Sequence, residues 1–150
     1  MIAYLALHVL GVVIWVGGMF FAHLMLRPSA AMLEPAIRLP LWRRVLTRFF
    51  LWVWLAVAAL LLSGFAMIAA LGGFRAVGGY IHAMMGIGLL MMALYTHLYF
   101  APWQRFRAAV GREDWALAQQ SLNQIRFVVT VNLVLGLLTV VIGSSGAYFG

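Results

Sequence analysis

The sequence predicts an all-α fold, a bundle of four transmembrane helices. Hydrophobic residues make up 66% of the 150-residue chain and charged residues only 9%, whereas about 25% of residues are charged in soluble domains. Four apolar runs are long enough to cross a bilayer core of about 30 Å, which takes roughly 20 residues per helix. A transmembrane barrel would need short segments of alternating polarity instead, and these runs do not alternate. We therefore expect a single transmembrane domain over residues 1–150.

Each predicted span is a continuous apolar run between more polar connections. The four spans cover about residues 2–26, 50–72, 77–101 and 127–148. Because the loop between the second and third spans is short and rich in glycine, we expect these two helices to be antiparallel neighbours.

The two longer connections differ in character. The 27–48 segment contains three prolines, and we expect it to bend over the membrane surface. Residues 103–125 break at Gly111 and continue as EDWALAQQSLNQI. This pattern predicts an amphipathic helix with acidic residues in its first turn.

Arginine placement predicts the orientation of the bundle. Nine of the ten basic residues lie in or beside the 27–48 and 102–126 connections, and only Arg75 lies in the remaining loop. Basic residues are retained on the cytoplasmic side of a membrane. Both termini are therefore predicted to lie outside, and the first and third helices to run in the same direction.

Charge and cysteine content exclude several classes of function. The net charge of +7 comes from arginines that flank the spans, where they set topology and contact anionic lipid headgroups. We therefore expect membrane lipids, and no nucleic acid, as partners. With no cysteine in the chain, disulfides, thiol redox chemistry and cysteine-ligated metals are excluded.

All four histidines fall into two matched places within the spans. The run YLALHVLGVVIWVGGMFFAH contains His8 and His23, and the run YIHAMMGIGLLMMALYTH contains His82 and His97, in each case 15 positions apart. Ionisable groups inside a bilayer are costly and usually functional. Since the spans contain no Asp, Glu or Lys, no acidic partner accounts for these histidines.

Neutral imidazoles can bind a haem iron from both of its faces. Fifteen residues correspond to about 22 Å along a helix. In parallel helices this spacing brings His8 level with His82, and His23 level with His97. The pattern predicts two b-type haems, one near each membrane face, with the four histidines as iron ligands. Hydrogen bonding of each histidine between helices is the alternative.

Other residues fit the same hypothesis. The glycines that would leave room for a flat porphyrin are Gly11, Gly17, Gly18, Gly86 and Gly88. The candidate partners of the haem propionates are Arg75 and Tyr80 outside, and Arg27, Arg48 and Arg105 inside. The polar residues expected to form hydrogen bonds between helices are Ser63, Thr130, Asn132 and Thr139.

Methionines offer a second possible metal site. Thioether sulfur is a soft ligand that suits Cu(I), although methionine is also an ordinary core residue. The methionines concerned are Met19, Met25, Met84, Met85, Met91 and Met92. The sequence alone leaves iron in haem and copper open.

The stretch LHVLGVVIWVGGMFFAHLMLRP, residues 7–28, resembles the opening helix of the CopD family, bacterial inner-membrane proteins associated with copper resistance. The shared features are a histidine, a Trp-x-Gly-Gly signature and a terminal Arg-Pro. The stretch NLVLGLL, residues 132–138, is similar to the last helix of that family. The resemblance implies a multi-pass protein of the bacterial inner membrane, and the outer side predicted for both termini from the arginines would then be the periplasm.

Two further resemblances concern haem. HemJ-type protoporphyrinogen oxidases are similar in length and share a histidine seven residues before a tryptophan, as His8 precedes Trp15. Their aromatic-x-His-x-Lys motif is matched by YIHAM around His82, except that Met84 stands in place of the lysine. Two histidines on each of two helices also look like the di-haem membrane cytochromes b.

Taken together, the sequence predicts a b-type haem protein, with two haems, that passes electrons across the membrane between a donor and an acceptor. Copper transport or resistance of the CopD type and a HemJ-like oxidase are the alternatives. The chain shows no acid–base pair or nucleophile, so any enzymatic activity would be redox chemistry at the haem. Association into a homo-oligomer stays open.

Overall fold

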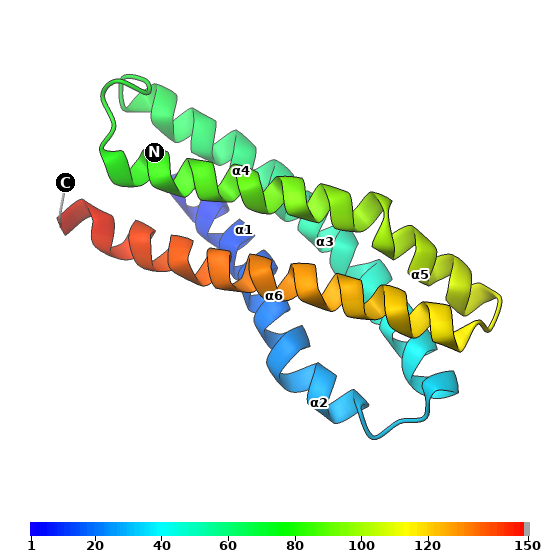
Figure 1. The fold of residues 1–150 in the computed structure, drawn as a ribbon. Coiled ribbons are helices and arrows are strands. Elements are labelled where there is room, and N and C mark those ends of the chain that lie inside the picture. Colours follow the sequence, from blue (N-terminus) through cyan, green and yellow to red (C-terminus); the bar gives the residue numbers. More distant parts are fainter. Residues whose placement is uncertain (149–150) are drawn as a thin grey trace.

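The computed structural model describes residues 1–148, and all regular structure in this part of the chain is helical (Figure 1). The helices are α1 (Ile2–Phe21), a π-helical turn η1 (Ala22–Leu26), α2 (Arg27–Ala30), α3 (Pro35–Ala70), α4 (Gly79–Phe100), α5 (Pro102–Gly111), α6 (Trp115–Ser145) and a 3₁₀ turn η2 (Gly146–Tyr148).

Four helical stretches are long and apolar enough to cross a membrane. They are Ile2–Ala30, Pro35–Ala70, Gly79–Gly111 and Trp115–Ser145. The predicted all-α bundle with four spans is therefore confirmed, and the chain is a multi-pass membrane protein. The side of the membrane on which the termini lie stays a prediction.

The expected bend over residues 27–48 is wrong for most of that segment. Only residues 31–34 connect α2 to α3, and α3 begins at Pro35 and continues through Pro40. Pro35 is tolerated in the first helical turn because its missing N–H has no partner there in any case, whereas Pro40 lies within the helix and removes one backbone hydrogen bond. The buried residues of this part of α3, Leu39, Trp42 and Leu46, recur every three to four positions, so a helical face is buried here.

The amphipathic helix expected after Gly111 does form, but it is continuous with the fourth span. Asp114 caps α6, and its side chain accepts a hydrogen bond from the Leu117 N–H at 3.1 Å. From Trp115 onward the helix runs without a break to Ser145. The acidic cap lies at the positive end of the helix dipole, which stabilises this start.

Packing divides the bundle into two antiparallel pairs, α1 with α3 and α4 with α6, and α5 also packs on α6. Gly11 and Gly18 allow the first pair to approach closely, because an added Cβ would meet Leu60 at 3.0 Å or the ring of Phe49. The expected neighbours α3 and α4 are antiparallel, and they meet through large aromatic side chains. Tyr95 of α4 donates to the Phe50 carbonyl of α3 at 2.9 Å.

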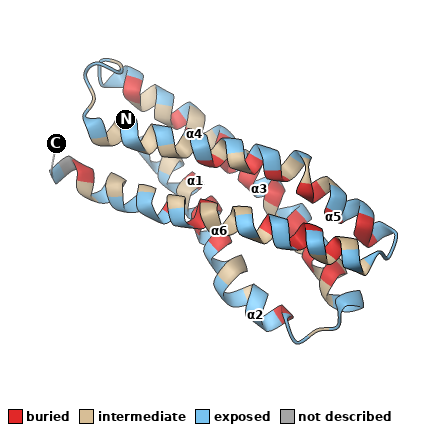
Figure 2. Ribbon diagram, viewed as in Figure 1, coloured by how far each residue is buried: buried red, intermediate tan, exposed pale blue. Residues whose placement is uncertain are grey.

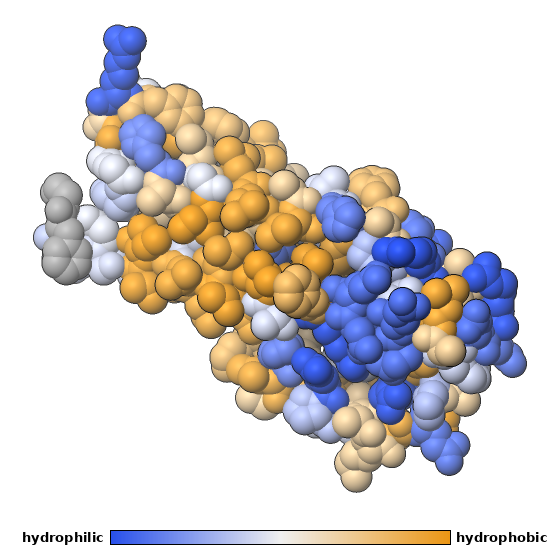
Figure 3. Space-filling view, viewed as in Figure 1, coloured by the Kyte–Doolittle hydropathy of each residue, from blue (hydrophilic) through white to orange (hydrophobic). Residues whose placement is uncertain are grey.

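The two ends of the bundle differ in charge and packing. We call the end with residues 27–48 and 101–126 the arginine-rich end, and the end with both termini and the 71–78 loop the terminal end. Figure 3 shows an apolar surface over most of the bundle that gives way to a hydrophilic one at the arginine-rich end. Buried residues are concentrated toward the arginine-rich end (Figure 2).

Candidate functional site

The four histidines lie on the two helices that run in the same direction. His8 is on α1 and His23 is in the η1 turn that continues it, while His82 and His97 are in the first and last turns of α4. His8 and His23 are half-buried and the other two are exposed.

His8 is held by a hydroxyl group of α3. Its Nδ1 lies 3.0 Å from Oγ of Ser63, which is fully buried. The Ser63 hydroxyl donates its hydrogen to the carbonyl of Ala59 in its own helix. With its hydrogen used in this way the hydroxyl accepts from His8, which favours the tautomer that carries its hydrogen on Nδ1 and keeps a free lone pair on Nε2.

His23 has the same arrangement with α6. Its Nδ1 lies 3.5 Å from Oγ1 of Thr130, a long contact, and the Thr130 hydroxyl donates to the Arg126 carbonyl at 2.8 Å. With that hydrogen used in its own helix, the Thr130 hydroxyl is placed to accept from Nδ1 of His23, which favours the tautomer with a free Nε2. The hydrogen bonds expected of Ser63 and Thr130 between helices are thus made to histidines.

His82 uses a backbone carbonyl instead of a hydroxyl. Its Nδ1 lies 3.2 Å from the Gly78 oxygen, which can only accept. The imidazole therefore also donates from Nδ1 and leaves Nε2 free. The ring centroid of Phe74, from the 71–78 loop, lies 6.3 Å from that of the imidazole.

In three of the four histidines, Nδ1 therefore faces a hydrogen-bond acceptor, and the tautomer that this favours leaves Nε2 available to a ligand. Histidines that ligate metals usually donate their second ring nitrogen to a carbonyl, carboxylate or water, which fixes the ring and raises the basicity of the ligating nitrogen. The arrangement is thus suited to a metal ion or a haem iron.

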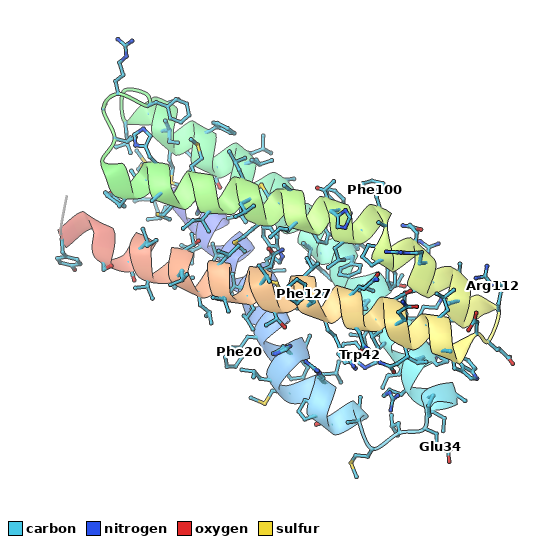
Figure 4. The ribbon with its side chains drawn as sticks, viewed as in Figure 1. Phe20, Glu34, Trp42, Phe100, Arg112 and Phe127 are labelled. Carbon is cyan, nitrogen blue, oxygen red and sulfur yellow. The ribbon has the colours of Figure 1, made fainter. Side chains whose placement is uncertain are left out.

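His97 differs from the other three. It lies beside an open groove of about 600 Å³ between α4, α5 and α6, and its ring forms no hydrogen bond with a side chain or carbonyl of residues 1–148. Arg105 also borders this groove and donates to Gln124 Oε1 at 2.9 Å. Figure 4 shows Phe100 and Phe127 on the helices beside this region.

The histidines of the two helices do not touch each other in the described residues. Val16 of α1 and Met91 of α4 both approach Gly136, at 2.8 and 3.2 Å from an added Cβ, so these two residues lie at similar depth. His8 precedes Val16 by eight positions and His82 precedes Met91 by nine, which is close to the expected register. However, α1 packs mainly on α3 and α4 on α6. Pairing of His8 with His82, and of His23 with His97, stays a prediction.

Aromatic side chains occupy the centre of the bundle between the two histidine levels. The ring of Tyr95 is 6.0 Å from Trp15 of α1, and 5.7 and 5.0 Å from Phe50 and Trp54 of α3. This cluster joins α1, α3 and α4 across the bundle axis.

The glycines expected to make room for a porphyrin fall into two groups. Side chains of α3 fill the space beside Gly11 and Gly18, so these two glycines leave no room for a cofactor. An added Cβ at Gly17, Gly86 or Gly88 would meet no atom within 4 Å. Space is therefore open along α4 and at one position of α1.

The methionines do not form one site. Met19 and Met91 are buried at the centre of the bundle, whereas Met84 packs near the terminal end against Gly143 of α6. The structure forms no group of three histidine, aspartate or glutamate side chains that could hold a metal ion, within the residues it describes.

Only some of the polar residues predicted to contact a cofactor lie near the histidines. Arg75 is exposed in the loop that also contributes Phe74, the neighbour of His82. Arg27 is exposed, one residue beyond η1. Asn132 donates to the Met91 carbonyl at 3.1 Å, as expected of a contact between helices, whereas Thr139 donates to Leu135 of its own helix.

A stacked pair at the arginine-rich end was missed in the sequence. The guanidinium carbon of Arg126 lies 5.5 Å from the centroid of the Trp42 ring. Arg126 was interpreted only as a topology signal, because it stands at the start of an apolar run. The helical spacing of Trp42 with Leu39 and Leu46 could have indicated its buried position.

Comparison with known proteins gives one match. The family model for copper resistance protein D (CopD) matches residues 43–145, which cover most of α3 and all of α4, α5 and α6. No curated protein and no solved structure matches the chain.

Proposed function

The chain belongs to the copper resistance protein D family, and from this premise we propose that it handles copper within the membrane, with Cu(I) as its cargo. Imidazole nitrogen and thioether sulfur are the protein ligands that suit Cu(I), and both types are present in the apolar spans. A soft ion of this kind does not need the cluster of carboxylates that a hard cation would need.

The observation that carries this proposal is the geometry shared by His8, His23 and His82. In each imidazole Nδ1 faces a neutral oxygen, that of Ser63, Thr130 or the Gly78 carbonyl. This geometry favours the tautomer that leaves the Nε2 lone pair for a ligand. Ligands that are already oriented by a hydrogen bond lose little entropy when they bind a cation inside the low-dielectric bilayer.

A second candidate is b-type haem with electron transfer across the membrane. It is supported by the same free Nε2 atoms, by the equal spacing of the histidines and by the similar depth of Val16 and Met91 on α1 and α4. Haem would supply one-electron chemistry, while His8, His82, His23 and His97 would hold the iron and Arg75 or Arg27 the propionates. Of these, His97 lacks the engaged Nδ1 of the other three.

The experiment that tests both candidates uses the purified protein in detergent. Cu(I) affinity is measured by competition with a chromogenic chelator, and an absorption spectrum records any haem. We expect Cu(I) binding at the terminal end to fall about tenfold or more in the variants His8→Ala and His82→Ala. Because His23 lies about 22 Å from His8 along the helix axis, His23→Ala should instead weaken a second Cu(I) site.

The matched control is His97→Ala. Because Nδ1 of His97 has no hydrogen-bond acceptor among the described residues, this replacement should leave Cu(I) affinity unchanged. A protein that binds no Cu(I) but shows the reduced-state bands of low-spin haem would replace the copper proposal with the haem proposal. In that case His23→Ala and His97→Ala should remove the same haem.

The copper proposal also includes a location, the bacterial inner membrane with both termini in the periplasm. This orientation follows because nine of the ten basic residues lie at the arginine-rich end and basic residues are retained on the cytoplasmic side of a membrane. A reporter enzyme that is active only in the cytoplasm should give no signal when it is fused to either terminus, and a signal when it is inserted in residues 31–34. Activity at a terminus would invert this orientation.

A further inference from the structure

Three parts of the chain that are far apart in sequence bring cationic side chains together at the arginine-rich end. Arg27 follows η1, Arg38 lies near the start of α3, and Arg126 lies on α6. We call these three residues the arginine cluster. The positive charges of Arg27 and Arg38 both act on the Arg126 guanidinium, so both lie close enough to Arg126 to repel it.

Within residues 1–148, no carboxylate forms a hydrogen bond with the arginines of the cluster. Arg38 donates to neutral acceptors, the Leu33 carbonyl at 3.1 Å and Gln119 Oε1 at 3.0 Å. The whole chain has only three acidic residues. One of them, Asp114, caps the start of α6, and no acidic residue is among the charges that act on Arg126. Like charges held together without compensation destabilise a protein.

Two buried hydrogen-bond donors beside each other have no partner among the described residues. They are Nε of Arg126 and Nε1 of Trp42, and the two side chains are stacked on each other. Trp42 is only 4% exposed. A buried donor without an acceptor destabilises a protein, so this place lacks an acceptor as well as a negative charge.

One chemical class supplies both of the missing features. An oxyanion carries negative charge and several acceptor lone pairs, and guanidinium groups match the geometry of phosphate oxygens. The adjacent η1 turn is π-helical, a rare conformation that occurs frequently at functional sites. Figure 4 shows side chains with nitrogen atoms around Trp42 at this end of the bundle.

We propose that the arginine cluster and Trp42 form a binding site for a phosphate-type oxyanion. The site uses none of the four histidines and does not depend on the proposed copper function, although Arg27 is also the propionate partner named for the haem alternative. Its position, where the apolar surface gives way to the hydrophilic one, allows two sources for the same chemistry: the headgroup of an anionic phospholipid or free phosphate. Arg27 is exposed, so it can contact an anion arriving from either source.

The test measures binding of two probes to the purified full-length protein. Inorganic phosphate is titrated calorimetrically at constant ionic strength in a neutral detergent. Retention of phosphatidylglycerol, with phosphatidylcholine as the neutral comparison, is measured by native mass spectrometry after release from mixed bilayers. We expect at least one anionic probe to bind, and the probe that binds identifies the source.

Three variants distinguish the proposed site from diffuse charge. Arg126→Gln should weaken binding about 10- to 100-fold, since it removes a charge-assisted contact. Trp42→Phe keeps the ring and the net charge but removes the Nε1–H, and it should weaken binding about fivefold. The control Arg44→Gln removes an exposed arginine of the same helix as Trp42, and it should change binding less than about twofold.

The outcomes leave the proposal either supported or overturned. Binding of neither probe overturns it, and so does an Arg44→Gln effect as large as that of Arg126→Gln, which would mean nonspecific attraction to the basic surface. If Arg126→Gln does not fold, Trp42→Phe decides alone. An unchanged affinity in Trp42→Phe then rejects the site.

Discussion

The arginine-rich end and the terminal end of this bundle are built from the same four spans but are packed differently. Toward the arginine-rich end, Trp103, Phe106 and Ala118 are at most 1% exposed. At the terminal end, no residue of α1 before Gly11 and no residue of α4 before Met91 is buried. The contrast is visible in Figure 2.

The two ends therefore differ in their roles: one contributes most to stability, and the other is suited to ligand binding. Close packing of α3, α5 and α6 gives the arginine-rich end most of the buried contacts that hold a membrane bundle together. The terminal end has two of the imidazoles that a hydrogen bond orients, His8 and His82, and open space beside Gly86 and Gly88. A part of a protein with few buried contacts can rearrange around a ligand at low cost.

The largest expected effect compares one phenylalanine at each end. Phe106 of α5 is fully buried, while Phe65 of α3 is 49% exposed near the terminal end. Phe106→Ala should lower the free energy of unfolding by about 3–5 kcal/mol, because it leaves a cavity in a packed region. Phe65→Ala should lower it by less than about 1 kcal/mol. Unfolding of both variants is followed by circular dichroism in mixed micelles, and equal losses would show that the two ends are equally packed.

The next effect concerns the support of His8 at the terminal end. Ser63→Ala removes the acceptor of the His8 Nδ1–H and should lower Cu(I) affinity about tenfold or more, while stability falls by less than about 1 kcal/mol. Ser144→Ala is the matched control, because its hydroxyl donates only to the Val141 carbonyl of its own helix. A Cu(I) affinity that is the same in both variants would remove His8 from the proposed site.

The fold was predictable from the sequence because crossing a bilayer requires a long apolar run, and hydropathy alone reveals such runs. The pairing of the helices was not predictable in the same way. It depends on local fits, such as the space that Gly18 leaves for the Phe49 ring. The extension of α3 back to Pro35 does not follow from the sequence, because three prolines within 27–48 favour a bend, although Pro35 fits the first turn of a helix.

For the candidate site, the sequence predicts the type of ligand, histidine, but not the hydrogen-bond acceptors of these histidines. The spacing of 15 positions picks out the histidines, since matched ionisable groups in apolar runs need a reason. The acceptors of their Nδ1 hydrogens, Ser63 and Thr130, come from other helices. Which face of α3 or α6 points at a histidine depends on how each helix is rotated in the bundle, and spacing along one helix does not determine that rotation.

A smaller effect is expected for the hydrogen bond that joins the two helix pairs. Tyr95→Phe removes the hydroxyl that donates to the Phe50 carbonyl and should cost about 1 kcal/mol of stability, as for a typical hydrogen bond within a bundle. Tyr99→Phe is the control, since Tyr99 lies in the same aromatic cluster and its hydroxyl donates to no described residue. A larger loss in Tyr99→Phe would mean that aromatic stacking, and not this hydrogen bond, joins α3 to α4.

The smallest expected effect tests whether the space beside α4 at the terminal end is used. An added Cβ at Gly86 meets no atom within 4 Å, and alanine is favoured over glycine within a helix by about 1 kcal/mol. Gly86→Ala should therefore leave the stability of the ligand-free protein unchanged or raise it by up to about 1 kcal/mol. Cu(I) affinity should also stay the same, because a single ion held by Nε2 atoms does not need this space. A flat macrocycle beside α4 would need it, so a loss of bound haem in Gly86→Ala, with stability unchanged, would favour the haem proposal over the copper proposal. Haem content and thermal unfolding of the same preparation decide between the two.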